Sequence, residues 1–138
     1  MKPYLFFVYW RHYVPKALRD QFTCVGFHMT DLPFGRGGSP LQNLILRGYT
    51  KTMISAFLVT EEWDAGPLLM KHSLSLTGSA QDIFDRASDI IYNTMIPHIL
   101  LTHPTPTPQQ GTPVFFHRIN KTEYPEPTRM WDAWGYHT

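Results

Sequence analysis

The feature that most constrains the fold of this chain is a glycine- and proline-rich loop between an apolar run and a helix start. The apolar run Cys24–Phe27 leads directly to His28, and the loop that follows closes on Ser39 and Pro40. Serine is a favoured N-cap and proline a favoured first helical residue, so a helix is predicted to begin there. In α/β proteins ligands bind beyond the carboxyl ends of strands, so this order of elements predicts a site at the histidine. From geometry alone, a tight turn with an incidental histidine explains the same residues equally well.

The first part of the chain predicts two parallel strands joined by a short helix. Residues 4–9 form a continuous apolar run rich in β-formers, which is typical of a strand buried on both faces. Residues 15–22 begin with proline and carry apolar side chains four positions apart, as a short helix does. Residues 23–27 are then the next strand. Because a βαβ crossover is right-handed, both strands should end at the same edge of the sheet.

The rest of the chain continues in strands and helices, so the predicted fold class is α/β. A long helix should start at Ser79 and end or kink near Met95, because Pro97 follows. The other predicted elements are a helix at 40–47, antiparallel strands at 50–61 and 68–76 around an acidic loop at 61–67, an extended Pro/Thr linker at 102–111 without a core of its own, and a short strand at 113–117. We expect one domain at 1–119 and a Pro-rich aromatic tail at 120–138, in which Trp131 and Trp134 are candidates for docking.

Composition narrows the functional classes. The chain has 138 residues, of which 43% are hydrophobic and 14% aromatic, enough for one folded domain with a core. A formal net charge of +1 gives no electrostatic attraction to nucleic acid or membranes, and no apolar stretch approaches the ~20 residues that cross a bilayer. The single cysteine, Cys24, excludes an internal disulfide and suits a reducing compartment, so we expect a cytoplasmic protein. The remaining histidines lack metal-ligand spacing, so no metal site is expected.

Two motifs in register resemble the signature of the folate-dependent formyltransferases, which comprise the methionyl-tRNA, glycinamide-ribonucleotide and amino-sugar enzymes. The first motif is matched by His28, Thr30, Pro33, Arg36-Gly37 and Pro40. The second is an acidic loop of the Asp-x-Gly type, matched by Asp64-Ala65-Gly66 at the separation from His28 that family members show. The sequence departs from the family at Gly26, which stands where the family has its catalytic asparagine.

The resemblance implies a formyltransferase-like, partial Rossmann-type sheet with parallel strands, a C-terminal antiparallel portion and flanking helices. It covers most of residues 4–119 and corresponds to the second half of the family's catalytic domain. It implies transfer of a formyl group from 10-formyltetrahydrofolate to a primary amine, of the amino-sugar nucleotide or aminoacyl-tRNA class. Folate and a small amine are thus the expected partners, with tRNA the nucleic acid to consider. An uncovered first strand also leads us to expect a homo-oligomer.

The resemblance also implies roles for individual residues. His28 would be the proton shuttle, which a histidine neutral near pH 7 can be, and Asp64 would orient it. Gly26 cannot supply the amide that polarises the formyl oxygen, and losing one such donor typically costs ~10²–10³ in turnover. The residues implied in folate binding are Trp10, Arg11, His12, Tyr13, Trp63 and Asp64, with Pro15 completing the match of that loop; those implied in substrate binding are Thr30, Arg36 and Asn43.

Simpler explanations stay open for these residues. Asp64 alone fits an ordinary Asp-x-Gly turn, and Arg36 fits either an anion clamp or a solvated loop charge. Trp10 and Trp63 fit packing as well as stacking on a pteridine ring. Three functional classes therefore remain: a formyltransferase, a hydrolase in which water replaces the amine at the same folate site, and a non-catalytic binding module.

Overall fold

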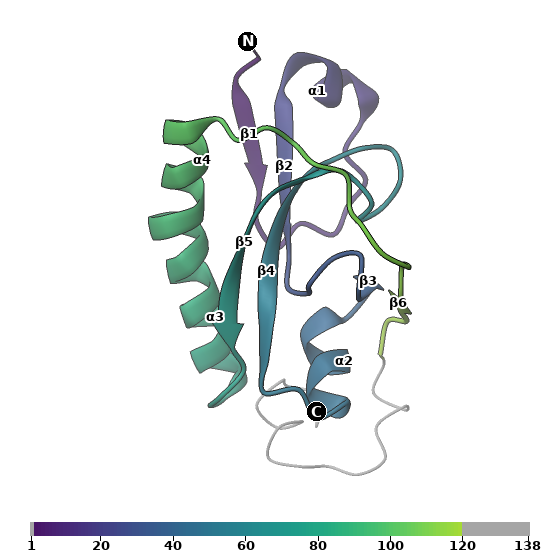
Figure 1. Ribbon diagram of the computed structural model, residues 1–138, viewed down its shortest axis with the longest axis vertical. Coiled ribbons are helices and arrows are strands. Elements are labelled where there is room, and N and C mark those ends of the chain that lie inside the picture. The colour runs from purple at the N-terminus through teal and green to yellow at the C-terminus, as the bar shows by residue number, and fades with distance from the viewer. Residues whose placement is uncertain (1, 120–138) are drawn as a thin grey trace.

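The computed structural model describes residues 2–119 and has an α/β fold built on a mixed four-stranded sheet. The strands lie in the order β1-β2-β4-β5, and a separate two-stranded pair joins β3 to β6. Figure 1 shows α3 and α4 as one rod along the sheet, with α2 beneath the β3/β6 pair. The elements are β1 (Tyr4–Phe7), α1 (Lys16–Gln21), β2 (Thr23–His28), β3 (Arg36–Gly37), α2 (Pro40–Leu46), β4 (Lys51–Leu58), β5 (Leu68–Ser75), α3 (Ala80–Ile90), a π-helical turn η1 (Ile91–Met95), α4 (Ile96–Thr102) and β6 (Phe115–Phe116).

Strand pairing confirms the predicted α/β class and the predicted mixture of directions. β1 runs parallel to β2, whereas β4 is antiparallel to both β2 and β5. Side chains alternate between the two faces of a strand, so Val25 and Phe27 join the core while Gly26 and His28 lie on the other face of β2. The core that the first face enters contains Ile54, Ala56, Leu74, Ile83, Ala87, Ile91, Met95 and Ile99.

The first strand differs from its predicted environment. All four residues of β1 are half-buried rather than fully buried, because β1 lies at the edge of the described sheet with β2 as its neighbour. A continuous apolar run does not distinguish a central strand from an edge strand whose faces are partly covered. The homo-oligomer expected from this edge stays a prediction.

The long helix begins as predicted and ends later than predicted. Ser79 accepts a hydrogen bond from the backbone N–H of Asp82 and donates its own N–H to the Asp82 carboxylate, which is a complete capping box. The helix does not end near Met95. It passes through η1 into α4, with Pro97 in the first turn of α4. The wider π turn accommodates the proline, whose ring would otherwise clash with the carbonyl four residues earlier.

The segment predicted as an extended linker is extended but is attached to the domain. Thr107 forms a β-bridge with Leu68, and the segment then leads to β6, which pairs in parallel with β3 (Figure 1). The short strand predicted at 113–117 is therefore confirmed. The predicted tail at 120–138, with Trp131 and Trp134, lies outside the described residues, so the division at 119 stays a prediction.

The predicted start of α2 is correct in position, but the predicted capping by the Ser39 side chain is wrong. Ser39 is the N-cap residue, but it has a left-handed φ of 48° and makes no side-chain cap. Its hydroxyl instead accepts a hydrogen bond of 3.0 Å from the backbone N–H of Ile119. The helix ends close to the predicted boundary at 47, with Arg47 as its C-cap residue. No helix within residues 2–119 is long and apolar enough to cross a membrane.

Candidate active site

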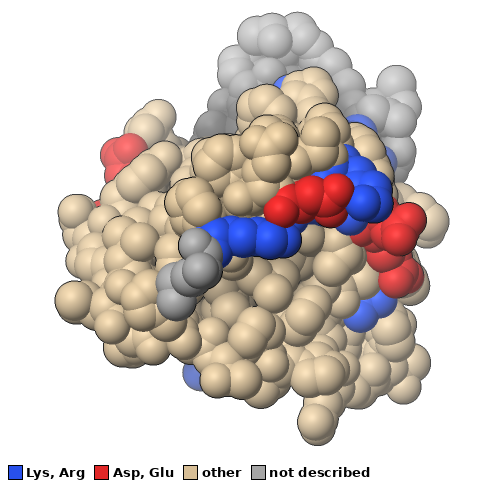
Figure 2. Space-filling view, turned by 90° about the horizontal axis from the view of Figure 1, so that it is seen from above, with Lys and Arg blue, Asp and Glu red and all other residues tan. Residues whose placement is uncertain are grey.

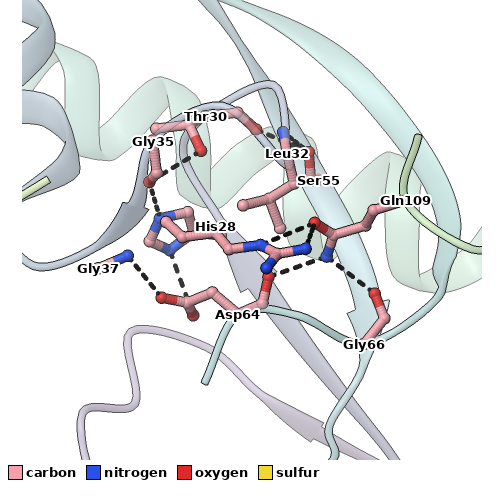
Figure 3. A network of polar contacts seen from close by, with 10 residues as sticks. His28, Thr30, Leu32, Gly35, Gly37, Ser55, Asp64, Gly66 and Gln109 are labelled. Atoms are coloured by element: carbon pink, nitrogen blue, oxygen red, sulfur yellow. Dashed lines mark hydrogen bonds and ion pairs between the residues drawn. The ribbon is translucent and has the colours of Figure 1, made fainter. Parts of the chain in front are cut away.

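His28 ends β2 with its imidazole fixed by the glycine loop. Its Nε2 lies 2.7 Å from the carbonyl oxygen of Gly35. A carbonyl oxygen can only accept, so Nε2 carries the hydrogen and donates it. In the neutral imidazole the lone pair is then on Nδ1, the nitrogen that points away from the loop (Figure 3). The loop that follows the histidine thus determines which ring nitrogen is available for proton transfer.

Asp64 faces that free nitrogen from the loop between β4 and β5. Its Oδ1 lies 3.7 Å from Nδ1 of His28, and its Oδ2 accepts a hydrogen bond of 2.9 Å from the backbone N–H of Gly37 (Figure 3). The predicted proximity of His28 and Asp64 is therefore confirmed. A separation of 3.7 Å is too long for a direct hydrogen bond, so both atoms keep a lone pair for a third group. The two side chains are 10% and 15% exposed, so that group can enter from solvent.

The Asp-x-Gly motif is required by backbone geometry. Asp64 has a left-handed φ of 55°, which aspartate tolerates better than most residues. At Gly66 a Cβ atom would lie 1.7 Å from the carbonyl oxygen of Leu58, the last residue of β4. The glycine therefore lets the loop pass directly against the end of the strand, which brings Asp64 back towards His28.

Gln109 completes this network and was not identified from the sequence. Its Nε2 donates hydrogen bonds of 2.8 and 2.9 Å to the backbone carbonyls of Asp64 and Gly66. Its Oε1 accepts hydrogen bonds of 3.1 and 2.9 Å from Nε and Nη2 of Arg36 (Figure 3). A glutamine inside a Pro/Thr run carries no periodic or motif signal, so sequence patterns could not have found it.

The residues predicted to bind substrate make hydrogen bonds within the protein, and their roles towards a substrate stay predictions. Thr30 is completely buried, and its hydroxyl donates to the Gly35 carbonyl. Arg36 is held by Gln109 and lies over the ring of Phe115. Nδ2 of Asn43 bonds to the carbonyls of Gly38, Ser39 and His117. All three side chains stabilise the glycine loop and its attachment to the last described strand.

Two adjoining cavities meet at the His28–Asp64 pair. The smaller has a volume of about 80 Å³, and the larger a volume of about 690 Å³. Residues that line both cavities are Trp10, Phe27, His28, Trp63 and Asp64. Of the other residues implied in folate binding, His12 and Tyr13 line the smaller cavity, and Arg11 lines the larger one. The structure thus brings all of them to the predicted sheet edge, while their roles stay predictions.

An aromatic ring fills the space beside Gly26, the residue that the resemblance aligns with the family's asparagine. Gly26 pairs with Phe57 across β2 and β4, and a Cβ atom at Gly26 would lie 2.8 Å from Cζ of that ring. Phe57 also lines the smaller cavity. The wall of the cavity beside His28 is therefore apolar where an amide would stand.

The two cavities are lined by charges of both signs, with Glu61 and Glu62 at the smaller cavity and Arg11 and Arg118 at the larger one. Figure 2 shows charged side chains gathered in a short row on the face viewed, and most of that face is uncharged. At the larger cavity, burial raises the pKa of the Tyr9 hydroxyl, which is hydrogen-bonded to Ser88. Within residues 2–119 no three His, Cys, Asp or Glu side chains are grouped so as to hold a metal ion.

Known proteins similar to this chain are formyltransferases. The methionyl-tRNA formyltransferase of Bacillus pumilus is 31% identical over 103 residues, which are 70% of this chain and 32% of that protein. The solved structure of the methionyl-tRNA formyltransferase from Clostridium thermocellum has 46% identity and a TM-score of 0.84, and the match covers 96% of this chain and 60% of that one. No family model matches the sequence.

A more distant structure shares the fold. The formyltransferase PseJ from Anoxybacillus kamchatkensis, solved with tetrahydrofolate and a formamido sugar nucleotide, has 12% identity and a TM-score of 0.65, over 83% of this chain and 64% of that one. The chain spans about a third of the length of its first curated relative and three fifths of the Clostridium thermocellum structure. The relationship is thus to a part of those proteins, and over that part the chain belongs to the folate-dependent formyltransferase family.

Proposed function

We propose that this chain forms the proton-transfer site of a formyltransferase that moves a formyl group from 10-formyltetrahydrofolate to a primary amine. The observation that carries the proposal is the 3.7 Å gap between Nδ1 of His28 and Oδ1 of Asp64. Two acceptor atoms that face each other without bonding suit a third group that brings hydrogens to both. An attacking amine is such a group.

The cavities suit a flat donor that reaches the pair from one side. The smaller cavity, at about 80 Å³, holds only a few ligand atoms, but it shares lining residues with the larger cavity of about 690 Å³, a volume in the usual range for ligand pockets. Trp10 and Trp63 are 53% and 54% exposed and line both cavities, so each ring presents a surface on which a heterocycle could pack. We expect the folate group to lie between the loop at 10–15 and the loop at 61–66. When bound, it supplies a formyl carbon attached to a nitrogen that must leave with a proton.

The chain's own residues would manage that proton. Nδ1 of His28 accepts a proton from the amine nitrogen as this nitrogen bonds to the formyl carbon, and later returns it to the leaving nitrogen. Asp64 stabilises the imidazolium formed in between, because its carboxylate is held opposite Nδ1. The Gly35 carbonyl keeps the hydrogen on Nε2 throughout, so one nitrogen performs both transfers.

The test is formyl transfer by the purified chain and two variants. We would mix the protein with 10-formyltetrahydrofolate and a panel of primary amines that includes an amino-sugar nucleotide and methionyl-tRNA, and follow the formylated product. His28→Asn and Asp64→Asn should each lower amine-dependent turnover about 10²–10⁴-fold. His98→Asn, an exposed histidine on α4, is the matched control and should be neutral.

The same assay separates the other functional classes. Formyl loss that does not depend on the amine would favour a hydrolase at the same site. Folate binding without turnover would favour a binding module. The ring of Phe57 in place of an amide donor is the observation that favours this last class.

A further inference from the structure

We propose that Gln109 is a positioning residue that holds Asp64 opposite His28, and that Arg36 holds Gln109. The proposal rests on the proposed function for its effect on turnover, whereas its structural part can be tested separately. Gln109 lies 81 residues after His28, in the segment whose Pro/Thr composition predicts only an extended linker. The proposal gives this segment a role in the site.

The contacts of Gln109 are directed at the two ends of the Asp-x-Gly turn. One amide nitrogen bridges the carbonyls of Asp64 and Gly66, at 2.8 and 2.9 Å. The first of these carbonyls belongs to Asp64, whose backbone is in the left-handed region, where a non-glycine residue is under strain. Such a conformation persists only where surrounding contacts fix it. The Gln109 amide supplies two of those contacts from the backbone side.

Arg36 determines which way the Gln109 amide faces. Its Nε and Nη2 both donate to Oε1 of Gln109, at 3.1 and 2.9 Å, so the oxygen is committed to the guanidinium and the nitrogen must face the turn. Arg36 also precedes Gly37, whose N–H binds Oδ2 of Asp64. The carboxylate and the backbone of Asp64 are therefore both held from the same two-residue strand, directly through Gly37 and by way of Gln109 from Arg36.

The substitution that isolates this contact is Gln109→Glu. A glutamate has the same shape and still accepts from Arg36, but it has no N–H for the two carbonyls. Gln110→Glu makes the same chemical change at the next residue, which is exposed, and serves as the matched control. Gln109→Met, which removes both sets of hydrogen bonds, is a second variant in case the glutamate disturbs folding.

Hydrogen exchange of one amide reports on the position of Asp64 without any assay of activity. The N–H of Gly37 is protected by the Asp64 carboxylate, whereas that of Gly38 is protected by the Phe116 carbonyl in the β3/β6 pair. Gln109→Glu should raise the exchange rate of Gly37 about tenfold and leave Gly38 unchanged. Gln110→Glu should change neither amide.

Turnover gives the second readout. Gln109→Glu should lower kcat about 10- to 100-fold, because small displacements of reacting groups have effects of this size, while KM for the formyl donor stays within about twofold. In an Asp64→Asn background, Gln109→Glu should cause no further loss, since its effect passes through Asp64. Equal exchange rates of the Gly37 amide in Gln109→Glu and Gln110→Glu would overturn the proposal. So would a further 10- to 100-fold decrease in kcat when Gln109→Glu is added to Asp64→Asn. A wild-type chain without formyl turnover would overturn the proposed function instead, and the exchange comparison alone would then decide the role of Gln109.

Discussion

Phe57 and Gly26 should be energetically coupled. Whether Gly26→Ala stabilises or destabilises the fold should depend on the side chain at position 57. Gly26 has no positive φ and lies inside β2, where glycine is intrinsically less stable than alanine. With open space beyond it, Gly26→Ala should therefore stabilise the fold by about 0.5–1 kcal/mol. The space is not open, because the new Cβ would lie 2.8, 3.2 and 3.4 Å from three atoms of the Phe57 ring.

The size of the clash gives the expected magnitude. Phe57 is 7% exposed, so most of its ring is packed against neighbours, and a shift of the ring towards the smaller cavity would lose part of those contacts. Overpacking of this kind costs about 1–3 kcal/mol, which exceeds the intrinsic gain from alanine. Gly26→Ala should then destabilise the wild-type chain by roughly 0.5–2 kcal/mol. In a Phe57→Leu background the clash is relieved, and the same substitution should stabilise by about 0.5–1 kcal/mol.

Urea unfolding of the four variants measures this cycle directly. We expect the urea midpoint to fall for Gly26→Ala alone and to rise when it is added to Phe57→Leu, with m unchanged. Thermal unfolding should show a shift of about 3–5 °C for each kcal/mol. An equal stabilisation by Gly26→Ala in both backgrounds would refute the reasoning, because it would mean that the Phe57 ring does not occupy the space beyond Gly26.

Two further predictions follow from pKa shifts. Hydrogen bonding by the Ser79 backbone and side chain lowers the pKa of Asp82 in the folded state. The ionised carboxylate therefore stabilises the fold at pH values above its unfolded-state pKa of ~4. This contribution is lost as the pH falls through the lower folded-state pKa. Asp82→Asn should thus lower the urea midpoint at pH 7, and the difference should shrink progressively below pH ~4, whereas a constant difference would contradict it. Burial raises the pKa of the Cys24 thiol, so its reaction with a disulfide reagent at pH 8 should be at least about tenfold slower in the native chain than in urea; equal rates would contradict this.

The sequence allowed prediction of those parts of the fold whose signal is local. Hydrophobic runs located the strands, and the residues Ser79 and Asp82 located the start of the long helix. The proximity of His28 and Asp64 was predicted from two motifs, each carried by residues near the ligand-facing end of a strand. Local patterns succeed here because each element has a periodicity or a capping signal of its own.

The parts that could not be predicted depend on contacts between distant residues. Thr30 and Arg36 are polar residues between β2 and α2, and Asn43 is a polar residue within α2. Sequence position alone does not distinguish a ligand contact from a contact with buried backbone at these residues. Their partners include the Gly35 carbonyl, the His117 carbonyl 74 residues after Asn43, and the Gln109 side chain 73 residues after Arg36. The extension of the helix past Pro97 is also unpredictable, because a π turn has no reliable sequence signal.

The pairing of β3 with β6 explains why Gly37 is free to hold Asp64. Successive N–H groups of a strand point to opposite sides, and those of Arg36 and Gly38 bind the carbonyls of Val114 and Phe116. The N–H of Gly37 between them must therefore point away from β6, and on that side it meets the Asp64 carboxylate.

Only glycine fits at this position. Gly37 has a φ of 105°, and a Cβ atom there would lie 2.3 Å from the Phe116 carbonyl oxygen. The last described segment of the chain thus acts on the site twice, since Gln109 holds the backbone of Asp64 and β6 sets the direction of the donor that holds its carboxylate. A substitution that separates β6 from β3 should therefore disturb Asp64 even though no residue of β6 touches it directly in the hydrogen-bond network.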